Sequence, residues 1–139
     1  MQRATVFLFL ILAFQGRAQL DCMLGVGGPD GETIAEVFQL NEAQREQLAN
    51  WGAELKYRND ILRDQAEYLL KRNDTTPPEE LLKVSKQYNA ILDSMHQNIR
   101  MMDRRMLALF NDRQYERYIQ LCRELSMRPI HINRSIDER

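Results

Sequence analysis

Two long segments of the chain carry an apolar residue at every seventh position. In the first segment these residues are Leu48, Leu55, Leu62 and Leu69. In the second they are Leu81, Tyr88, Met95, Met102 and Leu109. A seven-residue apolar repeat among good helix formers is typical of α-helices that pack lengthwise against one another. The pattern predicts two long amphipathic helices, one over about residues 41–72 and one over about residues 77–109.

The linker between the two segments cannot continue a helix. It is the stretch 73–78, which contains Pro77 and Pro78, and prolines remove backbone donors and clash with the preceding turn. Thr76 and Glu79 fit a capping box that would start the second helix. We therefore expect the second helix to fold back on the first. One antiparallel register brings the two stripes together in order: Leu48 with Met102, Leu55 with Met95, Leu62 with Tyr88 and Leu69 with Leu81.

A third helix is predicted from Asp112 to about Met127, and Pro129 ends it. No segment between residues 40 and 128 shows the two-residue period of a strand. The predicted fold class is therefore all-α: a long antiparallel helical hairpin with the third, C-terminal helix packed on it. Because a two-helix hairpin buries little apolar surface, either this helix or a second copy of the chain must cover it. A homodimer is thus one of the arrangements that the sequence allows.

The first 18 residues have the features of a secretory signal peptide. Arg3 is followed by the apolar run Val6–Phe14, and the small residues Gly16 and Ala18 fit a cleavage site after Ala18. Cleavage after Gly16 and cleavage after Gln19 are alternatives. The run of about nine residues is shorter than the roughly 20 that a membrane-spanning helix needs. An uncleaved anchor is the alternative. The prediction is a periplasmic or secreted protein whose mature chain has no transmembrane segment.

Three further regions follow the signal segment. Residues 19–39 form a Gly-rich N-terminal arm, expected to be flexible, with a short helix within Glu32–Phe38. Residues 40–128 form the helical hairpin domain, and residues 129–139 a flexible tail. Gly52 interrupts the first long helix, where it would permit either a bend or the close approach of another backbone.

Charge and cysteine content narrow the choice of partners. The full chain has a net charge of −1, and loss of residues 1–18 removes two arginines and no acid, which leaves −3. Nucleic acid is therefore excluded as the main partner, since phosphate binding needs a cationic excess. In an oxidising compartment Cys22 and Cys122 could form a disulfide across a loop of 100 residues. The alternative is a buried Cys122 and a mobile Cys22.

The starts of the first and third helices share a local pattern: apolar, Asn, acidic, any residue, Gln, any residue, Glu. In this pattern Asn caps the helix and Gln at the third helical position completes a capping box. The motif residues are Leu40, Asn41 and Gln44 in one copy, and Phe110, Asn111 and Gln114 in the other.

This arrangement resembles the Spy/CpxP family of periplasmic stress proteins over about residues 38–127. Members of that family carry two Leu-Thr-x-x-Gln motifs, one at the start of a long helical hairpin and one near its end. The chain departs from the family motif by Asn in place of Thr in both copies and by Phe110 in place of Leu. The resemblance implies a curved, thin, all-α dimer that binds unfolded or aggregation-prone proteins without ATP. Some relatives instead damp an envelope-stress sensor or sense metals.

A client-binding surface is the remaining option for a functional site. Several apolar and basic side chains lie partly off the main stripes, and such a mixed surface suits loose binding of varied polypeptides. The residues chosen for this surface are Arg58, Ile61, Tyr68, Arg100, Met101, Arg104 and Arg105. The wider set also includes Tyr57, Leu70, Lys71, Arg72 and Leu107. The alternative is that these residues pack against the third helix or a second copy.

Other site chemistry finds little support. His96 lies among methionines, but these belong to the core stripe and no second histidine follows at i+4; His131 is in the tail. No catalytic arrangement is evident. We therefore predict no metal, no cofactor and no enzyme activity. The expected function is that of an exported ATP-independent chaperone-like or envelope-stress protein, whose partners are unfolded or misfolded proteins or an envelope sensor protein. The alternatives are a metal-responsive or stress-sensing regulatory subunit and a structural helical interaction module.

Overall fold

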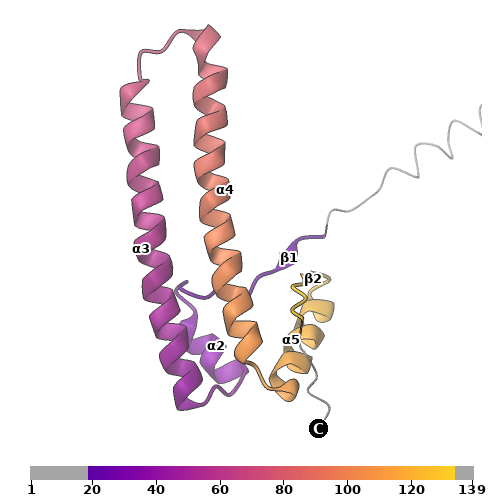
Figure 1. The fold of residues 1–139 in the computed structure, drawn as a ribbon. Helices are drawn as coiled ribbons and strands as arrows, with labels where there is room; N and C mark the ends of the chain where they lie inside the picture. The colour runs from indigo at the N-terminus through magenta and orange to yellow at the C-terminus, as the bar shows by residue number, and fades with distance from the viewer. Residues whose placement is uncertain (1–18, 134–139) are drawn as a thin grey trace, which may run out of the picture.

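The computed structural model describes residues 19–133, so the predicted signal peptide (1–18) and the end of the tail (134–139) lie outside the described residues. The elements are β1 (Asp21–Cys22), α2 (Gly31–Val37), α3 (Glu42–Arg72), α4 (Pro78–Leu109), α5 (Asp112–Glu124) and β2 (Arg128–Pro129) (Figure 1). The described chain is mostly helical, and the two strands have two residues each, which agrees with the all-α prediction. Within residues 19–133 no helix combines the length and the hydropathy needed to cross a bilayer.

Helices α3 and α4 lie side by side and run in opposite directions (Figure 1). Their register differs from the one expected from the leucine repeat. Asn98 donates a hydrogen bond of 3.0 Å to Asn59, whereas the expected register places Asn59 opposite Ile91. The observed register is thus shifted from the expected one by seven residues. Because both apolar stripes repeat every seven residues, the same helix faces remain in contact. In Figure 1 the first turns of α4 extend beyond the end of α3, which produces this offset.

The core lies at the base of the α3/α4 pair, where the arm, α2 and α5 pack. Only Ala66 is buried among residues 56–101, while Leu62 and Tyr88 are half-buried and Leu81 is exposed. The buried apolar residues of the base are Cys22, Val26, Ile34, Ala35, Phe38, Leu40, Leu48, Leu55, Met102, Met106, Leu107, Phe110, Tyr118, Cys122 and Ile130. The apolar stripes therefore form a closed core in the base alone, and the far half of the pair is a thin two-helix extension.

The N-terminal arm is bound along the base, contrary to the expected flexible segment. Successive backbone N–H groups of Leu24, Gly25 and Val26 donate to the buried carboxylate of Asp103 on α4, at 2.6, 3.1 and 2.9 Å. The next residue, Gly27, has φ of +80°, a conformation that favours glycine. A Cβ atom on Gly52 would lie 3.3 Å from the Gly27 Cα, so Gly52 provides for the close approach of another backbone.

A disulfide between Cys22 and Cys122 joins the arm to α5 and decides between the two alternatives left open by the sequence. Beside it β1 pairs with β2 in parallel, with Asp21 opposite Arg128. The hydroxyl of Tyr118 donates to the Cys22 carbonyl at 2.7 Å and accepts from the Ile130 N–H at 2.8 Å. Pro129 and Ile130 are therefore fixed against the core, although they lie at the start of the tail (129–139) that was expected to be loose.

Two of the three predicted helix caps are present. Asn41 and Asn111 both form complete capping boxes, with Gln44 and Gln114 as the reciprocal partners. The third prediction, a Thr76–Glu79 box, is wrong: α4 begins at Pro78 without a side-chain cap, and the Thr76 hydroxyl contacts the Asn73 side chain instead.

Candidate binding surface

The two repeated motifs meet at the base of the molecule. Gln44 and Gln114 are both buried, and their side-chain amides exchange two hydrogen bonds of 2.9 Å. The Gln44 amide also donates to the Leu109 carbonyl at 2.8 Å, and the Gln114 amide to the Phe38 carbonyl at 3.0 Å. Each amide oxygen in addition accepts the N–H of its own cap residue. The motif glutamines thus join the starts of α3 and α5 directly.

The motif residues have a structural role at this junction. Phe110 is buried and its ring lies 4.8 Å from that of Phe38, while Leu40 belongs to the same core. Within the described residues no buried side-chain nitrogen or oxygen lacks a hydrogen-bond partner. The hydrogen-bonding groups of the two motif glutamines are therefore occupied within the fold.

One side of the α3/α4 pair, which we name the open side, is not covered by the arm, α2 or α5. It is formed by residues that repeat at helical spacing on each helix. On α3 they are Glu54, Arg58, Ile61, Gln65, Tyr68 and Arg72, and on α4 they are Lys83, Gln87, Ala90, Gln97, Met101, Arg104, Arg105 and Ala108. The arm and α2 pack on a different face of α3, the one that carries Leu48, Gly52 and Leu55.

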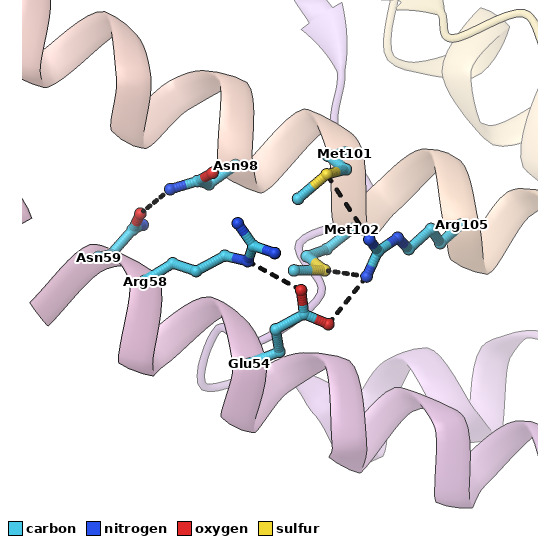
Figure 2. Close-up of polar contacts among 7 residues, drawn as sticks. All are labelled: Glu54, Arg58, Asn59, Asn98, Met101, Met102 and Arg105. Atoms are coloured by element: carbon cyan, nitrogen blue, oxygen red, sulfur yellow. Dashed lines mark hydrogen bonds and ion pairs between the residues drawn. The ribbon is translucent and has the colours of Figure 1, made fainter. Parts of the chain in front are cut away.

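A carboxylate between the helices orders the basic residues near the base (Figure 2). Glu54 accepts from Arg58 at 2.8 Å and, through its other oxygen, from Arg105 of α4 at 2.8 Å. The hydrogen bond from Arg58, together with Arg105, lowers the pKa of Glu54 below its ordinary value. The Arg105 guanidinium also lies 3.7 Å from the sulfur of Met102 and 3.8 Å from that of Met101. Glu54 therefore anchors both arginines, and Arg105 in addition lies against two methionine side chains.

Exposed apolar side chains accompany these arginines. Tyr57 is 69% exposed, Ile61 42% and Tyr68 65%. Toward the tip, Tyr68 borders a groove of about 570 Å³ between α3 and α4, together with Arg72 and Lys83. On α4 a second hollow of about 530 Å³ is lined by Gln97, Arg100, Met101, Arg104, Arg105 and Ala108. Apolar and cationic groups thus alternate along the open side.

The structure brings together most of the residues predicted for a client surface. Arg58, Ile61, Tyr68, Met101, Arg104 and Arg105 share the open side. Arg100 is at its edge, where it forms an ion pair with Asp21 of the arm. Leu107, included in the wider set, is fully buried because α4 turns it into the base.

The sequence did not single out Asp103 and Asp21, two carboxylates whose pKa values the fold shifts. Burial raises the pKa of Asp103, against the opposing effect of the three N–H donors of the arm. Asp21 accepts from both Arg100 and Arg128, and these contacts, the hydrogen bond from Arg128 first, lower its pKa. Both acids fix the arm by binding residues that are almost 80 or more positions away in the chain. No local sequence pattern therefore distinguishes them.

Within residues 19–133, no three His, Cys, Asp or Glu side chains lie where they could together hold a metal ion. His96 on α4 and His131 after β2 are both exposed, and the methionines Met102 and Met106 are buried in the core.

Comparison with known proteins identifies no relative. No family model matches the chain, and neither a curated protein nor a solved structure is similar to it.

Proposed function

We propose that the chain is an exported, ATP-independent chaperone-like or envelope-stress protein of the Spy/CpxP type, which binds unfolded or aggregation-prone polypeptides on the open side. The observation that carries the proposal is the alternation of exposed apolar groups with arginines there, as in Ile61 beside Arg58. Cations attract a polypeptide at long range, and shallow apolar contacts then hold it loosely.

Two other features support this proposal. The Cys22–Cys122 disulfide suits an oxidising compartment such as the periplasm or the extracellular space, where the predicted signal peptide would send the chain. The meeting of the two Asn-x-x-Gln motifs gives a physical reason for two copies of the motif, because each glutamine is the partner of the other. A second copy of the chain would cover the half-buried stripe around Tyr88, so a homodimer forms part of the proposal.

Light scattering of a reduced, aggregating client protein tests the proposal. The mature chain at near-stoichiometric concentration should suppress aggregation without ATP. Replacing Ile61 and Tyr68 together by Ser should weaken this suppression, because both side chains are exposed on the open side. Leu125→Ser is the matched control, since Leu125 is 65% exposed but lies beyond the end of α5. No suppression by the wild type, or equal suppression by the double variant, would refute the proposal.

A further inference from the structure

The hollow on α4 is built differently from the rest of the open side. Three arginines line it and no carboxylate does, although the chain as a whole is slightly acidic. Met101 and Ala108 supply its apolar floor together with the methylene stems of the arginines. An anion in this hollow would face several guanidinium groups, the side chain best suited to bind carboxylates and phosphates with two parallel hydrogen bonds.

Two of the arginines are anchored by acids outside the hollow. Arg105 donates to Glu54 of α3 at 2.8 Å, and Arg100 forms its ion pair with Asp21 of the arm. These contacts hold the two guanidinium groups on opposite flanks, so that little side-chain entropy remains to be lost when a ligand binds.

The third arginine, Arg104, lies between the two flanks and is exposed. Among residues 19–133 the Arg104 side chain forms neither an ion pair nor a hydrogen bond. It is therefore the guanidinium that can bind a ligand without breaking an existing contact.

The shape of the hollow restricts the ligand. All its lining residues belong to α4, whose backbone groups are bonded within the helix, so the polar contacts of the hollow come from side chains alone, the three arginines and Gln97. Three guanidinium groups beside an apolar floor suit a ligand with an anionic head and an apolar part that lies on Met101 and Ala108.

From these observations we infer that the α4 hollow binds a single-chain anionic amphiphile, a carboxylate on an alkyl chain of the fatty-acid type, as a monomer. Arg104 binds the carboxylate between Arg100 and Arg105, and the alkyl chain lies along Met101. This site goes beyond polypeptide binding and does not depend on it.

Isothermal titration calorimetry of the full mature chain with decanoate, kept below its micelle concentration, tests the inference. The wild type should bind decanoate and should not bind acetate, which lacks the alkyl chain. Arg104→Gln should weaken binding by about tenfold, as loss of a charge-assisted hydrogen bond does. Met101→Gln should weaken it without changing charge. Arg123→Gln, an equally neutralising change at an exposed position of α5, should leave binding unchanged.

Three results would overturn the inference. The first is no heat of decanoate binding. The second is an Arg104→Gln variant that binds as well as the wild type. The third is binding only to phosphatidylglycerol vesicles and not to decanoate, which would indicate a membrane surface as the ligand. None of these results bears on the aggregation assay, so the two proposals fail separately.

Discussion

Replacing Gln114 by Ala tests the junction between the two motifs. The Gln114 side chain donates to the Phe38 carbonyl and to Gln44, and it accepts from Gln44 and from the Asn111 N–H, all at 2.9–3.0 Å. At about 1 kcal/mol net for each bond, with a further cost for the groups left unpaired in a buried site, the loss should be about 3–5 kcal/mol. Gln120→Ala on the exposed side of the same helix should change stability by less than about 0.5 kcal/mol.

A double-mutant cycle separates the energy of the Gln44–Gln114 contact from that of the other hydrogen bonds of Gln114. Two of the four bonds join Gln44 to Gln114, so the coupling energy between Gln44→Ala and Gln114→Ala should be about 2 kcal/mol. Urea unfolding followed by circular dichroism at 222 nm gives the four free energies of unfolding. If the two substitutions prove additive, the glutamines do not stabilise one another and the reasoning fails.

Four further substitutions test the base of the fold and its contrast with the two-helix extension. Leu55→Ala should lower the free energy of unfolding by about 2–5 kcal/mol, whereas Leu62→Ala, at a half-buried position, should cost roughly 1 kcal/mol; equal losses in urea melts would contradict this. Gly52→Ala should destabilise despite a gain of about 1 kcal/mol in helix propensity, because its Cβ would meet the Gly27 backbone; a stabilised variant would refute the close approach. Because burial raises the pKa of Asp103, the folded chain holds this proton more tightly than the unfolded chain, so the wild type should gain stability relative to Asp103→Asn as pH falls from 7 toward 4. Urea melts across that range measure the difference in free energy of unfolding between the wild type and the variant. A difference that moves against the wild type as pH falls would contradict the prediction.

The long helices and their caps could be predicted because their signals are local. The Asn41 and Asn111 boxes need only the four residues that form each of them, and α3 ends at Arg72 where the linker begins. The register could not be fixed in this way. A seven-residue repeat accepts any shift by a whole heptad, and the choice among shifts depends on how the linker places the first turns of α4.

The bound arm could not be predicted because its partners are distant in the chain. A glycine-rich stretch indicates flexibility when it is considered alone. Here Gly25 and Gly27 both have positive φ. Gly25 is one of the three residues whose N–H groups bind the Asp103 carboxylate, and Gly27 directly follows them. Asp103 has no feature in the sequence that distinguishes it from the other acids, which are mostly on solvated faces. The repeat also treats Leu55 and Leu62 alike, although only Leu55 has the arm packed against it.

Methyl NMR of the mature chain with an unfolded client tests the proposed binding surface most directly. The signals of Ile61, Ala90 and Met101, all on the open side, should shift as client is added. The signals of Val37 and Leu125, exposed elsewhere, should stay in place. Shifts confined to Val37 and Leu125, with an unchanged open side, would contradict the account.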